Sequence, residues 1–482
     1  MQVARSPIKH PKNLLLVLLA AVSLTVVARG AVILHAAPPV PGSPRGDGSL
    51  ERPFRDLTQA VAIARALSER RVPESPDSAT RVTLLLAPGD YILEPHADIE
   101  PTCGNCTDPA TPVPMTFGLR IGGRGIAIEG SEEGPAVIHT RAGYGLLFQD
   151  CTECRLRAVI VTDGARDTSG MATDAAVVVQ HSSVAIEDCL LRDNIGDPAT
   201  LEHTIVGIIG IAGREGARLR VHRNRIIRQS WDGIALYRDA EAEITGNVID
   251  GIDLALGRQA GGGRGVGIGL TWNAQASVRG NLVRRYWKGI GVFVDARATV
   301  EENIVERVAT WGLSLWDAGQ GRPQGFFRGN AVDSTGACGA MVARSSTGPP
   351  EAGYLRENLF LRTGQNPKYD SGEPYCFQVA IARYAPGDSF TLEGNLFLDN
   401  REAGGGAGSG DLERAAFLAR AQPLLARLAA WPALQESGLL ARLGPDAVPS
   451  GAGERQNERS GDLPRTGGRP GDPSHDRWKT GR

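Results

Sequence analysis

The chain repeats one phrase, which reads HRNRIIRQSWDGIALY at 222–237, RGNLVRRYWKGIGVF at 279–293 and EENIVERVATWGLSLW at 301–316. Weaker copies continue to residue 400. The Asn residues of the successive copies are Asn224, Asn247, Asn281, Asn303, Asn330, Asn358 and Asn395, and they lie 22 to 37 residues apart. Internal periods of this length predict stacked supersecondary units that bury their apolar faces against their neighbours.

Each copy places an Asn before a short apolar run, and a Gly before alternating apolar positions. The alternation after Gly233 and Gly289 has the period of two that marks a β-strand with one buried face. Asn tolerates the left-handed conformation of a tight bend, and its amide can join a ladder of identical residues in neighbouring coils. The pattern therefore predicts a β-solenoid of short parallel strands.

These repeats resemble the right-handed parallel β-helix proteins of the pectate-lyase-like superfamily, over roughly residues 45–400. The stretch GDGSLERPFRDLTQAV at 46–61, an apolar strand at 82–87 and PGDY at 88–91 are similar to the start of many exported members. The resemblance implies an all-β fold, a single right-handed parallel β-helix of about a dozen coils. It does not specify a reaction.

The other segments complete a predicted organisation. Basic residues precede an apolar run at 14–28, which is typical of a secretory signal cleaved after Gly30 or Ala36, or alternatively of an uncleaved anchor. The predicted parts are a signal or anchor at 1–36, a linker at 37–53, a capping helix at 54–72, the β-helix at 80–400, a helical cap on the last coil at 411–444, and a disordered tail at 445–482.

The charge composition limits the classes of binding partner that we expect. The net charge of −2 argues against nucleic acid or an anionic membrane surface as the main partner. We expect a monomer that is secreted, periplasmic or displayed at the cell surface, and that contacts a membrane only through its N-terminal segment.

Seven cysteines are present, and four of them form two CxxC pairs, at 103–106 and 151–154. In an exported chain we favour disulfides over zinc, because the spacing between the pairs exceeds that of common zinc ribbons. A bond between Cys103 and Cys106 would tie down a long loop. Cys154 could instead be plain core, and Cys338 and Cys376 are expected to face each other.

A candidate groove follows from the residues after each repeat Gly. The second position is small and the fourth is larger, and both should point outward: Ala235, Gly269, Gly291 and Ser314, then Tyr237, Thr271, Phe293 and Trp316. Aromatic side chains can hold the apolar faces of sugar rings. The predicted substrate-binding residues are Tyr237, Trp272, Asn273, Phe293 and Trp316.

Charged residues follow the same strands, and the predicted catalytic residues are Arg238, Asp239, Asp295, Asp317 and Arg344. Carboxylates at one strand edge could bind Ca²⁺ and remove a proton next to a uronate. The alternative is structural, because Asp after a strand often closes a turn. His203 could also supply a base, although no metal-binding motif accompanies it.

Three functions remain open: an exported lyase or hydrolase acting on an acidic polysaccharide, a non-catalytic glycan-binding protein using the same groove, and a structural cell-envelope protein. Carboxylates set close to a basic residue would favour the first, and aromatic residues without acid–base partners the second.

Overall fold

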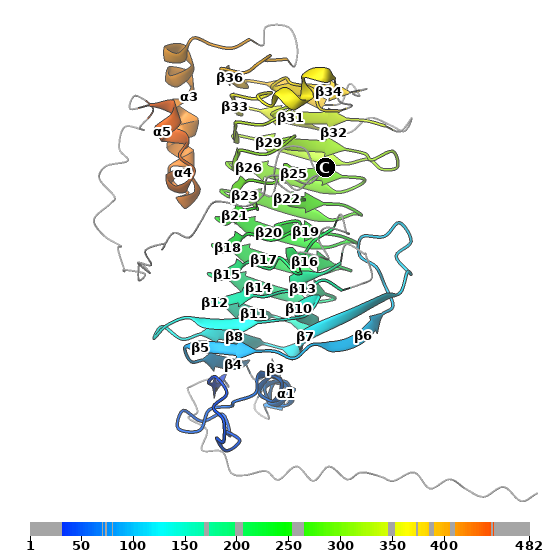
Figure 1. Cartoon of the computed structure of the whole chain (residues 1–482), viewed down its shortest axis with the longest axis vertical. Helices are drawn as coiled ribbons and strands as arrows, with labels where there is room; N and C mark the ends of the chain where they lie inside the picture. Colours follow the sequence, from blue (N-terminus) through cyan, green and yellow to red (C-terminus); the bar gives the residue numbers. More distant parts are fainter. Residues whose placement is uncertain are drawn as a thin grey trace, which may run out of the picture.

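The computed structural model describes residues 31–69, 71–72, 75–79, 81–167, 173–197, 206–252, 265–345, 352–372, 375–384, 390–404, 410–444 and 447. Three sheets that run along a stack of coils make up most of this structure (Figure 1). Their strands pair in parallel, except β6 with β7. None of the helices in the described residues is long and apolar enough to cross a membrane.

Most coils contribute one strand to each sheet. Sheet 1 holds β1 (Ala31–Ala36), β4 (Arg81–Leu86), β8 (Ile126–Gly130), β11 (Cys154–Arg157), β14 (Ser183–Glu187), β17 (Arg218–His222), β20 (Glu241–Thr245), β23 (Gln275–Arg279), β26 (Arg297–Glu301), β29 (Gln324–Arg328), β32 (Ala352–Arg356) and β35 (Phe390–Glu393). Sheet 2 holds β5 (Gly89–Ile92), β9 (Ala136–His139), β12 (Val159–Thr162), β15 (Leu190–Arg192), β18 (Arg225–Ile227), β21 (Val248–Asp250), β24 (Leu282–Arg284), β27 (Ile304–Glu306), β30 (Ala331–Asp333), β33 (Leu359–Leu361) and β36 (Leu396–Leu398).

Sheet 3 follows sheet 2 in each coil. It holds β6 (His96–Glu100), β7 (Val113–Arg124), β10 (Tyr144–Thr152), β13 (Ala175–Gln180), β16 (Ile209–Arg214), β19 (Ile234–Leu236), β22 (Val266–Leu270), β25 (Lys288–Phe293), β28 (Leu313–Trp316), β31 (Ala340–Ala343) and β34 (Ile381–Tyr384). A separate antiparallel pair joins β2 (Arg71–Val72) to β3 (Ser75–Ala79). The twelve strands of sheet 1 agree with the predicted number of coils.

The predicted Asn ladder runs along the turn between sheets 1 and 2, where the seven Asn side chains stack coil upon coil. The Oδ1 of Asn281 accepts from the backbone N and the Nδ2 of Asn247, both at 2.9 Å. Its own Nδ2 donates to Oδ1 of Asn303 at 2.9 Å and to the carbonyl of Ile244 at 2.9 Å. Because these amides are buried, each missing member would leave polar groups without partners.

The N-terminal end of the solenoid differs from the prediction at one boundary. Helix α1 (Leu57–Ser68) covers the first coil as expected, and the Asp56 side chain caps it by accepting from the N of Thr58 at 2.8 Å. However, Ala31–Ala36, which the sequence placed in the signal segment, form β1 and pair with β4 along all six residues. Since Leu34 and Ala36 are buried core residues, residues 31–36 belong to the folded solenoid.

The predicted C-terminal cap is a lateral cover instead. Helices α3 (Arg414–Leu428), α4 (Pro432–Glu436) and α5 (Leu439–Leu443) lie beside sheet 2 in Figure 1 and pack on its outer face. Apolar side chains such as Leu282, Ile304 and Leu359 point outward there and need burial. The cover is fastened by ion pairs of Arg442 with the buried Glu306 and Asp333. The predicted disordered tail lies almost wholly outside the described residues.

Candidate functional site

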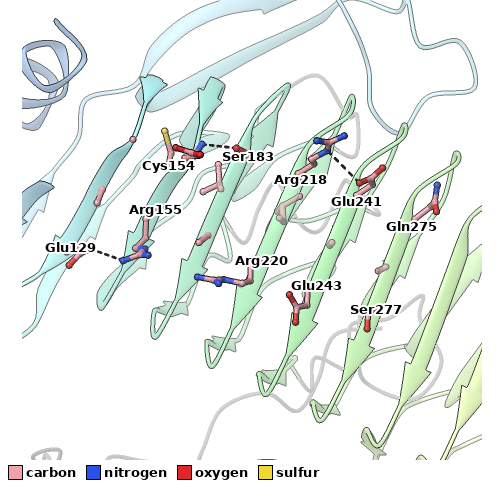
Figure 2. A pocket seen from close by; sticks show the side chains of 18 of the residues that line it. Glu129, Cys154, Arg155, Ser183, Arg218, Arg220, Glu241, Glu243, Gln275 and Ser277 are labelled. Atoms are coloured by element: carbon pink, nitrogen blue, oxygen red, sulfur yellow. Dashed lines mark hydrogen bonds and ion pairs between the residues drawn. The ribbon is translucent and has the colours of Figure 1, made fainter. Parts of the chain in front are cut away.

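A trough with a volume of about 1030 Å³ lies on the outer face of sheet 1 (Figure 2). It is lined by outward-facing residues of successive strands, including Arg155 of β11, Arg220 of β17 and Glu243 of β20. Their charges are largely paired within the protein. Arg155 lies 3.7 Å from Glu129 and 3.6 Å from Glu187.

The same neutralisation continues along the trough, because Arg220 also pairs with Glu187 and Arg218 lies 3.6 Å from Glu241. These side chains are mostly half exposed, so each pair contributes little to stability, roughly 0–1 kcal/mol. When the outward charges of a sheet face pair with one another, the face is stable in contact with solvent and needs no ligand to balance its charges. We therefore assign no ligand to the trough.

The outer face of sheet 3 has a different composition, and here the predicted register is confirmed. The small residues Ala235, Gly269, Gly291 and Ser314 pair directly with one another across β19, β22, β25 and β28. Phe293 pairs with Trp316 at the predicted larger position. The Phe293 ring lies over Gly291, since a Cβ added at this glycine would come within 2.1 Å of the ring.

Five aromatic rings follow this face from β25 to the segment after η1 (Pro367–Ser371), and we call them the aromatic row: Phe293, Trp316, Tyr375, Tyr384 and Phe377. Successive ring centroids lie 6.5, 6.4, 5.0 and 6.3 Å apart. Phe377 and Tyr384 are each 41% exposed, although large aromatic residues usually bury more of their surface. The other three rings of the row are partly exposed. A row that ends in two exposed rings is a candidate interaction surface.

A buried lysine lies beneath the row. The Nζ of Lys288 is 3.7 Å from the ring centroid of Trp287 and 4.5 Å from that of Trp311. It lies 5.9 Å from the ring centroids of both Phe293 and Trp316. Aromatic faces attract a cation, but burial still disfavours the charge and lowers the pKa of Lys288 to about 8.

The charge of Asp232 partly offsets this effect of burial on Lys288, because it raises the pKa of the lysine. Burial raises the pKa of Asp232 to about 7, even though the carboxylate accepts from the backbone N of Val266 at 2.6 Å. The hydroxyl of Tyr237 also hydrogen-bonds to it, and burial raises the pKa of Tyr237. Two titratable groups with pKa values moved toward neutrality lie in one place, which is typical of functional sites.

Sequence reasoning missed Lys288 and Asp232, although the repeat contained a signal. Both residues stand immediately before a repeat Gly, as do Trp311 and Cys338 in later copies. Equivalent positions of stacked coils lie side by side, so an acid, a base and an aromatic residue at one repeat position indicate a cluster.

The predicted site residues divide into four groups. Asp239, Asn273 and Asp295 come together as expected, in a hollow of about 340 Å³ at the turn between sheets 3 and 1. The backbone N of Asn273 donates to Oδ1 of Asp295 at 2.7 Å. Phe293 and Trp316 belong to the aromatic row.

Tyr237 and Asp317, in contrast, are buried rather than presented to solvent. Tyr237 turns toward Asp232. Asp317 closes the turn after β28 by accepting from the backbone N of Gly319 at 3.0 Å and of Ser345 at 2.8 Å. The expectation that these two line an open groove is corrected.

The two predicted arginines lie in different places. The guanidinium of Arg238 stacks on Trp272 at 4.3 Å from the ring centroid and donates to the carbonyl of Cys106, two coils before the row. Arg344 follows β31, whose Ala343 pairs with both Trp316 and Tyr384, so it lies beside the middle of the row. Its buried Nε makes no hydrogen bond within the described part of the chain.

The cysteines follow the disulfide interpretation at one pair. Cys103 and Cys106 are bonded. Cys151 and Cys154 are unbonded core residues. For Cys154 this is the alternative that the sequence offered. Cys338 is buried, and burial raises the pKa of its thiol. The charge of Cys376 raises this pKa further. Within the described ranges, no three His, Cys, Asp or Glu side chains gather to hold a metal ion. His203 lies outside these ranges.

The comparisons with known proteins bear on the fold. Residues 210–351 match the family model described as "Right handed beta helix region". Together with the three parallel sheets, this match shows that the chain is a right-handed parallel β-helix protein, with the hand that the resemblance implied. No curated protein sequence matches the chain.

Solved structures of the same fold include pectate lyase Pel9A, with 14% identity, a TM-score of 0.37, and coverage of 75% of this chain and 79% of that one. Another is PfbA, a surface adhesin of Streptococcus pneumoniae, with 8% identity, a TM-score of 0.37, and coverage of 68% and 74%. A tailspike protein of E. coli bacteriophage HK620 has 11% identity, a TM-score of 0.44, and coverage of 77% and 61%. These likenesses concern the fold alone.

Proposed function

We propose that the chain is an exported glycan-binding protein that holds an acidic polysaccharide on the outer face of sheet 3. The aromatic row is the observation that carries this proposal, because consecutive rings that are partly or largely exposed offer stacking platforms for successive sugar rings. The positive charges of Arg344 beside the row and of Lys288 beneath it favour a sugar that carries a carboxylate.

Calorimetric titration of residues 31–482 against polygalacturonate, alginate and a neutral β-glucan tests this proposal. Binding to a polyuronate is expected. Tyr384→Ala should weaken it about tenfold, since an exposed ring contributes about 1.4 kcal/mol of stacking.

Phe326→Ala is the matched control. Phe326 and Tyr354 form a similar surface pair on sheet 1, with ring centroids 5.4 Å apart. If Phe326→Ala weakens binding as much as Tyr384→Ala does, or if no polysaccharide binds, the assignment to sheet 3 is wrong.

A second candidate is cleavage of the bound glycan, which the lowered pKa of Lys288 favours. A neutral amine near pH 8 could take the proton next to a uronate carboxylate. The C–H electrons then form a double bond to the neighbouring carbon, whose C–O bond breaks, and the departing glycan oxygen takes a proton from water. Absorbance of the unsaturated product follows the reaction. Lys288→Met should abolish it if this candidate is correct, whereas Asp295→Asn tests the predicted acid of the neighbouring hollow.

Calcium belongs to the same proposal. Asp239 and Asp295 supply carboxylate oxygens of the kind that Ca²⁺ prefers, although Ca²⁺ needs six to eight oxygen ligands in total. Substrate and solvent would have to supply the rest. Titration of the polyuronate with and without a chelator tests this role: unchanged affinity would exclude it.

Export is inferred from the basic and apolar N-terminal segment. If the segment is cleaved, the mature chain should begin at Ala31, because β1 starts there. N-terminal sequencing of the protein recovered outside the cytoplasm checks this boundary, and a start after Ala36 would contradict it.

A further inference from the structure

The outer face of sheet 3 is covered at its N-terminal end by residues 93–116, which we call the excursion. It leaves the first coil, forms β6 antiparallel to β7, and contains the disulfide between Cys103 and Cys106. In Figure 1 its loop rises beside β13 and β16. The side chains beneath it point outward from the sheet and are nevertheless buried: Tyr144, Leu147, Val178, Ala212 and Ala235.

Buried polar contacts fix the excursion to this face. The guanidinium of Arg214 in β16 pairs with Glu100 of β6, and both side chains are almost wholly buried. The hydroxyl of Tyr144 donates to Glu100 at 2.5 Å, and the amide of Gln180 donates to it at 2.9 Å. Removing one partner of such a pair leaves an uncompensated buried charge, which is strongly destabilising. These contacts therefore hold the excursion firmly on the sheet.

The far end of the excursion touches the site. The carbonyl of Cys106 accepts from Arg238, whose guanidinium stacks on Trp272 of the next coil. The partly exposed Phe293 then begins the aromatic row one coil further on. Because the excursion lies over outward-pointing side chains of the sheet, it forms a step two coils before the row.

The opposite end of the row has a different form. Tyr384 and Phe377 are its most exposed members, and they lie at the end of the row that is remote from the excursion. Among the described residues, the face is thus stepped at the N-terminal end of the row and lined by exposed rings at the C-terminal end.

We propose that the excursion is a stop, and that the site binds the end of a glycan chain rather than its interior. The inference rests on the proposed function and adds a specificity to it. A chain that lies along the solenoid axis would reach from Tyr384 to Phe293 and then meet the Cys106 loop. Its terminal sugar would lie near Trp272 and Arg238, and the rest of the polymer would leave past Phe377.

The stoichiometry of binding tests this inference. Size-fractionated oligo- and polygalacturonates of known chain number are titrated calorimetrically into the protein. End binding predicts one protein per chain at every chain length. A number of bound proteins that grows in proportion to chain length would overturn the inference and leave the proposed function standing, whereas absence of binding to any fraction would remove both.

A shortened variant sharpens the test. Glu100 pairs directly with Val113, so an Asn-Gly turn can replace residues 101–112 while keeping the contacts of Glu100 with Arg214. This variant should bind at several places along a long glycan chain, so that more than one protein is bound per chain. If it folds, as judged by its melting curve, and still binds one per chain, the excursion is not the stop. If it fails to fold, the wild-type stoichiometry decides alone.

Discussion

The outer faces of sheets 1 and 3 are built on the same coils but differ in how their side chains are satisfied. On sheet 1, Arg and Glu side chains of neighbouring strands pair with one another, as Arg218 does with Glu241. On sheet 3, the partly exposed rings of Phe293 and Trp316 lie over Lys288, whose charged form is disfavoured by burial although the charge of Asp232 favours it. A face whose groups are mutually satisfied has little reason to hold a ligand, whereas sheet 3 keeps unsatisfied groups that a ligand could satisfy.

The largest expected effect concerns the buried ion pair on sheet 3. Arg214→Ala should lower the free energy of unfolding by about 3–5 kcal/mol, because it leaves the Glu100 carboxylate buried without its cation. Urea unfolding measures the loss. A change below about 1 kcal/mol would place this pair among ordinary surface pairs and break the contrast between the faces.

The second prediction concerns pH. The pKa of Lys288 is about 8 in the folded chain, lowered by burial from the usual 10.5, so between these values the unfolded chain binds more protons. The free energy of unfolding should therefore rise as the pH increases through this range, by on the order of 3 kcal/mol.

Lys288→Met should remove that rise, and urea unfolding at several pH values checks it. Lys368 is exposed, so Lys368→Met is the matched control and should keep the rise. Persistence of the rise in Lys288→Met would show that the lysine is not the group responsible.

The third prediction concerns the aromatic row. Trp316→Ala should weaken polyuronate binding by tenfold or more, because Trp316 contacts both Phe293 and Tyr375 and its loss disturbs the middle of the row. Calorimetry gives the affinity and thermal unfolding the stability. Loss of stability without loss of affinity would mean that this ring only packs.

The smallest effect is expected on sheet 1. Arg218→Ala removes an exposed ion pair and should change the free energy of unfolding by no more than about 1 kcal/mol. It should leave glycan affinity unchanged. A measurable loss of affinity would show that the trough takes part in binding.

The repeated phrase was sufficient to predict the coils, the Asn ladder and the register of sheet 3, since each of these depends on a period in the sequence. The outward position of Phe293 and Trp316 follows from the same period. Residues 31–36 were assigned to the signal or anchor because the apolar strand Ala31–Ala36 continues the character of the preceding apolar run, and the cleavage site itself stays a prediction.

Other features could not be read from the period, because they depend on which segment covers which face. The C-terminal helices were predicted as a cap on the last coil, although paired apolar residues such as Leu282 and Val283 indicate strands buried on both faces. Tyr237 belongs to a buried cluster that includes Met115 of the excursion, which comes from a distant part of the chain. Sequence spacing contains no record of such long-range covers.

The most direct test of the central claim compares two double variants in one titration with polygalacturonate. Tyr384→Ala/Phe377→Ala removes the exposed end of the aromatic row, and Phe326→Ala/Tyr354→Ala removes the corresponding ring pair of sheet 1. We predict that the first loses most of the affinity and that the second binds like the wild type. Equal affinities of the two variants, or loss only in the second, would contradict the assignment of glycan binding to sheet 3.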